Sequence, residues 1–249
     1  NIFDECQICA AETIQEIAKN TCPDRTYGMS ASPWRDDNAD LLIEAVVGRK
    51  IYEVDSSYLI DNGFLVRPFI KFIDVPRAPK FSSYQTAYSQ YIINNDTRND
   101  LIVQEVVRMV NDGRQTLVLF STIKHGDILY KRLKGLMPTQ LLSGKDSSDV
   151  RDDVKEGISN GNVRCLIASR IYDIGVDCPA LSGLVLAGGG KSSVRALQRI
   201  GRVIRKFPLK ENAEVIDFMD HATYLSEHAA ARLTIYQMEK GFIINGSTS

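Results

Sequence analysis

The sequence lacks a hydrophobic run long enough to cross a membrane. No apolar stretch approaches the roughly 18–20 residues of a spanning helix, and no charged segment followed by an apolar one opens the chain. Proline is scarce, with 8 among 249 residues, while hydrophobic residues make up 44% and charged residues 24%. This composition is typical of globular proteins and excludes collagen-like chains. We therefore expect a cytoplasmic protein, or a nuclear one in a eukaryote, that is not secreted and has no membrane partner.

Cysteine and histidine are scarce as well. The 5 cysteines are odd in number and irregularly spaced, which argues against a disulfide framework and favours a reducing compartment. Cys6 and Cys9 form a close pair, but the 3 histidines all lie far along the chain. Because a zinc site needs further ligands at suitable spacing, we expect structural thiols at this pair.

Charge and length set further bounds. The 30 Lys and Arg nearly balance 31 Asp and Glu, so the net charge is −1. A nucleic-acid partner remains compatible with this balance, since only the contacting face must be basic. A chain of 249 residues can form one large domain or two of ordinary size.

Apolar strands alternate with helical patterns along most of the chain. Expected helices are residues 8–20, 36–47, 97–111, 124–133, 146–159, 194–204 and 221–240; expected strands are residues 25–30, 116–120, 139–142, 163–168, 181–187 and 214–218. Such alternation is typical of βαβ units on a parallel sheet covered on both faces. The fold class is therefore predicted to be α/β.

The stretch from residue 51 to residue 89 interrupts this alternation. It contains several prolines and no long amphipathic helix, so we interpret it as the exit from one domain and a linker to the next. The predicted division is residues 1–66, a linker at 67–90, and a second domain at 91–249. Since the chain opens abruptly in an apolar strand, we expect the first domain to be only partly present.

Two acidic residues, Asp4 and Glu5, end that first strand. In nucleotide hydrolases an aspartate at such a place holds the magnesium ion, and a neighbouring glutamate orients and deprotonates the attacking water. Alone the pair is weak evidence, because helix N-termini also favour acidic residues.

A basic segment strengthens this interpretation. Residues 181–210 carry seven Lys or Arg and no acidic residue. Within it, Gln198, Arg202 and Arg205 have the spacing of one helix face. Two guanidinium groups a turn apart suit a γ-phosphate, although an isolated basic helix is more often a solvated face.

Six segments in order carry a resemblance: Asp4 to Gln7, Ser30 to Pro33, Phe120 to Thr122, Leu142 to Gly144, Ala168 to Cys178 and Gln198 to Arg205. They resemble the motifs of the superfamily 2 helicases and translocases. The sequences of residues 28–37 and 60–65 look more like those of the DNA-repair, phage-recombination and restriction-motor branch than those of the DEAD-box RNA branch.

The resemblance implies two RecA-like parallel-sheet domains, the second complete, with ATP bound between them. It implies Asp4 as the Mg²⁺ ligand, Glu5 as the general base, and Gln198, Arg202 and Arg205 as γ-phosphate residues. By the same resemblance Gly175 and Asp177 lie near the phosphates and ribose. Further residues match positions that touch nucleic-acid phosphates or couple the two sites: Ser30, Ser32, Thr122, Ser143, Gly144 and Ser169.

Three departures from the family pattern stand out. Gln7 replaces the usual His or Asp, and Ser32 replaces the usual Thr but keeps its hydroxyl. A phosphate-binding loop with a GxxxxGK(S/T) pattern is missing; residues 188–193 come closest, and we expect a strand-to-helix loop there.

These features predict an ATP-dependent DNA helicase or translocase that acts on single-stranded or branched DNA in repair or recombination, and they leave RNA open as a partner. Two alternatives stay open: a non-catalytic helicase-like module that binds nucleic acid, and the motor subunit of a restriction enzyme. The missing phosphate loop predicts that this chain alone is inactive.

Overall fold

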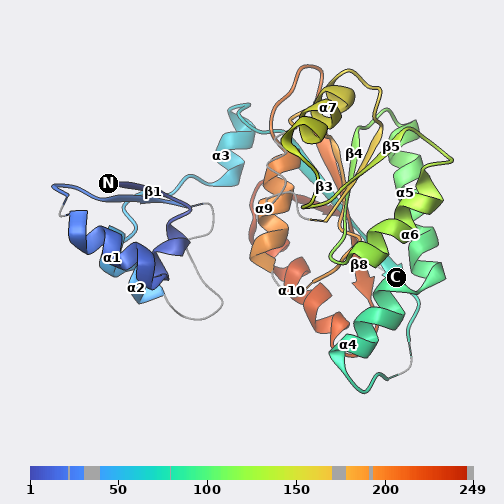
Figure 1. Ribbon diagram of the computed structural model, residues 1–249, viewed down its shortest axis with the longest axis horizontal. Helices are drawn as coiled ribbons and strands as arrows, with labels where there is room; N and C mark the ends of the chain where they lie inside the picture. Colours follow the sequence, from blue (N-terminus) through green and yellow to red (C-terminus); the bar gives the residue numbers. More distant parts are fainter. Residues whose placement is uncertain (22, 31–39, 79, 170–177, 191–192, 246–249) are drawn as a thin grey trace. The chain divides into compact units, whose positions relative to one another are not determined.

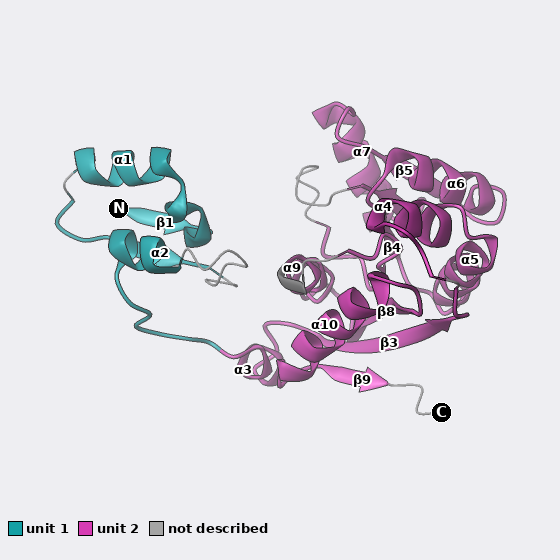
Figure 2. Cartoon of the chain, turned by 90° about the horizontal axis from the view of Figure 1, so that it is seen from below, with its two compact units in different colours: residues 1–54 teal, residues 55–249 magenta. Residues whose placement is uncertain are grey.

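The computed structural model describes residues 1–21, 23–30, 40–78, 80–169, 178–190 and 193–245. The chain divides into two compact units, residues 1–54 and residues 55–249 (Figure 2). The second unit thus begins earlier than the sequence suggested. Among the described residues of both units, no helix is long and apolar enough to cross a membrane.

Unit 1 is small. Strand β1 (Ile2–Asp4) pairs in parallel with β2 (Tyr27–Met29), and the helices are the 3₁₀ turn η1 (Cys6–Ala10), α1 (Glu12–Thr21) and α2 (Asp40–Val47). Cys6, Cys9 and Ile43 are buried together in its core. A Cβ at Gly28 would lie 2.8 Å from Val47 Cγ2 and 2.9 Å from Cys6 Cβ, so the close approach of β2 to this core requires glycine.

Unit 2 is built on a seven-stranded parallel sheet in the order β5-β6-β4-β7-β8-β3-β9 (Figure 1). Its strands are β3 (Arg67–Val75), β4 (Thr116–Leu119), β5 (Thr139–Leu142), β6 (Cys165–Ala168), β7 (Gly183–Val185), β8 (Asn212–Asp220) and β9 (Ile243–Asn245). Its helices are α3 (Ser56–Asp61), α4 (Tyr84–Ala87), the π-helical turn η2 (Tyr88–Ile93), α5 (Asp96–Asn111), α6 (Ile123–Leu133), α7 (Ser148–Ser159), α9 (Ser193–Val203) and α10 (Leu225–Met238). The predicted α/β class with a RecA-like parallel sheet is confirmed.

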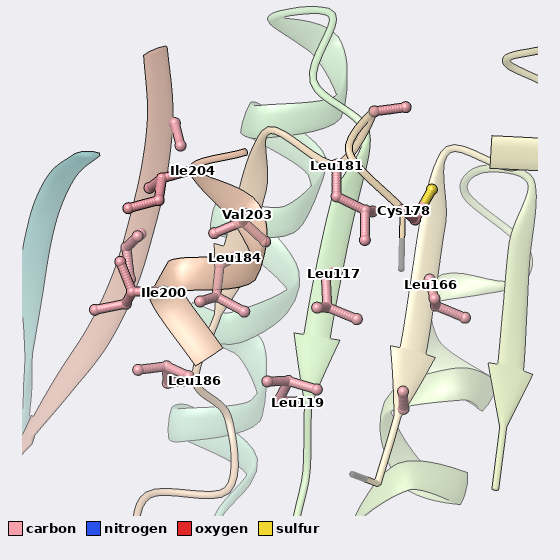
Figure 3. Packing of buried hydrophobic residues seen from close by; sticks show 14 of the residues in the cluster. Leu117, Leu119, Leu166, Cys178, Leu181, Leu184, Leu186, Ile200, Val203 and Ile204 are labelled. Carbon is pink, nitrogen blue, oxygen red and sulfur yellow. The ribbon is translucent and has the colours of Figure 1, made fainter. Parts of the chain in front are cut away.

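Helices cover both faces of this sheet. Alternate side chains of β4 point to opposite faces, so Leu117 and Leu119 join one core cluster while Val118 joins the other. Figure 3 shows the first cluster, where the strand leucines meet Ile200 and Val203 of α9. Full burial of each such side chain stabilises the fold by about 1.5–3 kcal/mol.

Strand β3 lies where the sequence suggested a linker. It pairs with β8 over nine residues, from Arg67–Asn212 to Val75–Asp220, and lies between β8 and β9. Ile70, Phe72 and Val75 are buried, whereas the side chains between them are at least partly accessible. The segment from residue 67 to residue 90 is therefore an integral part of unit 2, and the structure differs here from the expected linker.

Candidate functional site

The predicted magnesium ligand and general base lie where β1 ends. Asp4 is the last residue of the strand, and Glu5 adopts a left-handed backbone conformation with φ 53° and ψ 52°. The Glu5 backbone N–H donates to Asp4 Oδ1 at 2.9 Å. A non-glycine residue in this conformation costs of order 1–3 kcal/mol and such residues cluster at functional sites. The reversal at Glu5 takes its side chain out of the alternation that a continuing strand would impose.

Gln7 connects Glu5 to the next strand. Its Nε2 donates to Glu5 Oε2 at 2.7 Å, and its Oε1 accepts from Ser30 Oγ at 2.6 Å. Ser30 is in reach because the parallel pairing of β1 and β2 aligns Asp4 with Met29, one residue earlier. The residue that departs from the family pattern therefore links two predicted site residues. Ser32, the other predicted site residue of the Ser30–Pro33 motif, lies outside the described residues.

Asp4 has the donor chemistry that Mg²⁺ requires. Its carboxylate is exposed, and Oδ2 accepts no hydrogen bond from the residues that the structure describes. Mg²⁺ keeps several waters and takes one or two carboxylates together with phosphate oxygens, so a single aspartate fits this mode. The nearby thiols of Cys6 and Cys9 are buried, and this burial raises the pKa of each.

In unit 2, the carboxyl ends of β4, β6 and β5 lie side by side. The parallel register aligns Leu119 with Ala168 and Ala168 with Leu142. The loops that follow carry four predicted nucleic-acid residues, which the fold thus brings to one edge: Thr122, Ser143, Gly144 and Ser169.

Two hydroxyl groups on that edge differ in their bonding. Thr122 precedes α6, and its Oγ1 is buried with no hydrogen-bond partner in the described part of the chain. By contrast, the Ser143 hydroxyl donates to Asp146 Oδ2 at 3.1 Å, and its backbone N–H donates to the same oxygen at 2.6 Å. The carboxylate of Asp146 disfavours a phosphate beside Ser143, and the Thr122 hydroxyl oxygen is buried, so neither hydroxyl is placed to donate to a strand in this structure.

The glycine-rich loop after β7 is fixed through its carbonyl groups, and it does connect a strand to a helix, as expected. Arg98 Nη1 donates to Ala187 O at 2.7 Å, Tyr88 Oη to Gly188 O at 2.7 Å, and Arg232 Nη1 to Gly190 O at 2.9 Å. The loop leads into α9, so these three side chains fix the backbone that precedes this helix.

Two buried carboxylates orient those arginines. Arg98 donates two hydrogen bonds to Asp220, from Nε to Oδ1 at 2.8 Å and from Nη2 to Oδ2 at 3.3 Å. Arg232 pairs with Asp217 at 2.8 Å through each of two nitrogens, and the adjacent carboxylate raises the pKa of Arg232 above its usual value. All four side chains are at most 3% exposed. The sequence analysis missed these pairs, although acidic residues inside the apolar strand β8 were a signal.

The predicted γ-phosphate residues do not share one helix face. Gln198 and Arg202 lie on α9, but the helix ends at Val203. Arg205 then forms an isolated bridge with Leu65, and Ile204 O accepts from Val66 N–H at 2.8 Å. The expected helical position of Arg205 is therefore wrong, because a strand-like contact with a distant segment replaces the next helical turn.

Lys210 anchors the backbone around Arg205. Its ammonium group donates to the carbonyl oxygens of Pro179, Leu181 and Arg205, at 2.8, 2.6 and 2.8 Å. Burial lowers the pKa of Lys210 to about 8. The contact joins the backbone of Arg205 to the segment that follows residues 170–177. Gly175 and Asp177, the predicted phosphate and ribose residues, fall within residues 170–177, which lie outside the described residues.

Comparison with known proteins relates the chain to helicases. Residues 97–207 match the family described as helicase conserved C-terminal domain. The chain is 26% identical to the ATP-dependent DNA helicase uvsW of Enterobacteria phage T4, over 95% of this chain and 52% of that protein. Residues 97–207 thus resemble the C-terminal domain of helicases, and most of the chain is similar to a DNA helicase. Another relative is the putative DNA 3'-5' helicase Rad25 of Halobacterium salinarum, 27% identical over 82% of this chain and 34% of that protein.

Solved structures share the fold. The crystal structure of T4 UvsW aligns with a TM-score of 0.60 at 22% identity, over 98% of this chain and 53% of that chain. A fragment of a putative HsdR subunit of a type I restriction enzyme from Vibrio vulnificus aligns with a TM-score of 0.69 at 20% identity, over 93% and 45%. The chain spans about half the length of the curated relatives it matches first.

Proposed function

We propose that the protein is an ATP-dependent DNA helicase or translocase that remodels single-stranded or branched DNA in repair or recombination. The observation that carries this proposal is the hydrogen-bonded chain Glu5–Gln7–Ser30, which links the predicted water-activating carboxylate to a predicted coupling residue. A site retained only as an ancestral relic has no need of such a link. The two relatives named above are described as DNA helicases, which favours DNA over RNA.

The residues divide into two groups in this proposal. Asp4 would hold Mg²⁺, which supplies charge neutralisation for the ATP phosphates, and Glu5 would take the proton from the attacking water. Arg202 and Arg205 would stabilise the charge that develops on the γ-phosphate. Gly144 and Ser169 would contact the strand through its phosphates, without reading sequence, and Thr122 and Ser143 would join them once their hydroxyls are released from burial and from Asp146.

The decisive experiment measures ATP turnover by the whole protein at one fixed salt concentration. The substrates are single-stranded DNA, duplex DNA, forked DNA and single-stranded RNA. We expect stimulation by DNA, strongest with the forked substrate, and loss of turnover with retained ATP binding in Glu5→Gln. Glu16→Gln, an exposed carboxylate on α1, is the matched control and should turn over normally.

Variants of the arginines test the second group. Arg205→Ala should slow turnover much more than it weakens DNA binding, whereas Arg49→Ala, which removes an exposed arginine of unit 1, should do neither. No turnover with any nucleic acid would replace the proposal with the non-catalytic binding module. Stimulation by RNA alone would reject the DNA assignment.

A further inference from the structure

A small hollow adjoins the nucleic-acid edge of unit 2. It has a volume of about 310 Å³ and is lined by Tyr84, Gln85, Tyr88, Ser89, Ile93, Ser121 and Gly190. Ser121 directly precedes Thr122, and Gly190 ends the described part of the glycine-rich loop. A larger hollow of about 590 Å³ lies at the opposite edge, around the start of β5, away from all the predicted site residues.

Aromatic rings give this hollow its character. The Tyr84 and Tyr88 rings are 5.8 Å apart, and the Tyr84 ring lies 5.4 Å from His228 of α10. Tyr84 is 38% exposed, so its ring is accessible to a ligand. Tyr88 is held in place by its hydrogen bond to Gly188 O at 2.7 Å. The arrangement joins a fixed ring to an accessible one.

The lining chemistry selects among the parts of a nucleic-acid strand. Every lining residue is formally neutral, so none of them pairs directly with the charge of a phosphate. Ring faces suit the flat face of a base, and the side chains of Gln85, Ser89 and Ser121 can hydrogen-bond to a base edge. In the sequence, the first cation of the basic segment directly follows Gly190. Neutral rings joined in the chain to a basic segment suit a strand in which bases alternate with phosphates.

We propose that this hollow is a stacking site for one unpaired base of the bound strand, with Tyr84 as the stacking residue. The inference rests on the proposed function and adds to it a contact that recognises single-stranded character. A duplex offers no free base face, so the site would favour strands that are already separated, such as those at a fork.

The test compares two labelled oligonucleotides of equal length, an oligothymidylate and a fully abasic strand, by fluorescence anisotropy with the whole protein. Tyr84→Ala should weaken binding of the oligothymidylate by about fivefold to a hundredfold, the range for loss of one base–aromatic stack. Binding of the abasic strand should not change, and Tyr84→Phe should bind both strands like the wild type. Tyr58→Ala removes a 57% exposed tyrosine of α3 and is the matched control.

Salt dependence separates stacking from charge. Tyr84→Ala should lower the affinity for oligothymidylate by the same factor at each salt concentration, because no phosphate contact is lost. Suppose that the wild-type protein binds DNA and hydrolyses ATP. If Tyr84→Ala then weakens binding of both strands equally, or of neither strand, this inference alone is overturned. A wild-type protein that neither binds the strands nor hydrolyses ATP would overturn the proposed function as well.

Discussion

The buried pair between Arg232 and Asp217 yields a quantitative prediction. Arg232→Leu removes the guanidinium group that bonds Asp217 through two nitrogens and also bonds the carbonyl oxygens of Phe218 and Gly190. The variant leaves a carboxylate with 0% side-chain exposure without its counter-charge. Breaking such a pair from one side costs about 3–5 kcal/mol.

The remaining contacts of Asp217 place the cost near the lower limit. Its Oδ1 still accepts from the Phe218 backbone N–H at 2.7 Å, and its Oδ2 from Tyr236 Oη at 3.0 Å. We therefore expect Arg232→Leu to lower the free energy of unfolding of unit 2 by about 3 kcal/mol. Adding Asp217→Asn removes the buried charge, so the double variant should recover about 2 kcal/mol of that loss.

Hydrogen exchange of the β8 amides, measured against urea unfolding of the same protein, gives both values. Arg108→Leu is the matched control, because Arg108 pairs with Glu214 of the same strand but is 38% exposed, and its loss should cost less than about 1 kcal/mol. Equal costs for Arg232→Leu and Arg108→Leu would refute the reasoning. A double variant that is less stable than Arg232→Leu would refute it too.

Three further predictions concern other positions. Burial lowers the pKa of His125 from 6.5 to about 3, so the unfolded chain binds the extra proton first as the pH falls. The free energy of unfolding should therefore fall by about 1 kcal/mol between pH 6.5 and pH 5.5, and this fall should be absent in His125→Gln. Urea titrations at the two pH values measure it, and an equal fall in His125→Gln would contradict the prediction. A Cβ at Gly188 would lie 2.5 Å from Ser121 Oγ and 2.8 Å from Ser121 N, so Gly188→Ala should lower the melting temperature by several degrees, whereas Gly135→Ala, with open space around it, should not. Gln7→Ala should slow DNA-stimulated ATP turnover by about tenfold, since it removes one charge-assisted and one neutral hydrogen bond; a rate equal to wild type would show that the Glu5–Gln7–Ser30 link is dispensable.

Local patterns were sufficient for most of unit 2. The strand β4 is continuously apolar and is followed by a helix, so its place in a parallel sheet could be predicted from sequence. The strand β3 carries Lys71 and Asp74 among its apolar residues, with Pro68 inside it and Pro76 directly after it. These features hide a strand whose burial is created by β8, far along the chain.

Pairing between distant segments explains the features that local patterns did not predict. The apolar period of α9 continues to Ile204, but the contact with Leu65 takes the backbone of Arg205 out of the helix, and no local signal announces that contact. Burial of Arg98 likewise depends on Asp220, a partner 122 residues away. Arginine is mostly exposed in proteins, so a single sequence predicts a surface position for it.

The route by which the chain enters unit 2 has a mechanical consequence. A pull on the connection at Val54–Asp55 passes through α3 to Leu65 and Val66, which are bonded to the backbone of Ile204 and Arg205. Beyond them the load reaches β3, whose nine paired residues along β8 resist in shear, many hydrogen bonds at once. The sheet therefore acts as a stiff anchor, and the compliant point under tension is the short bridge that carries Arg205.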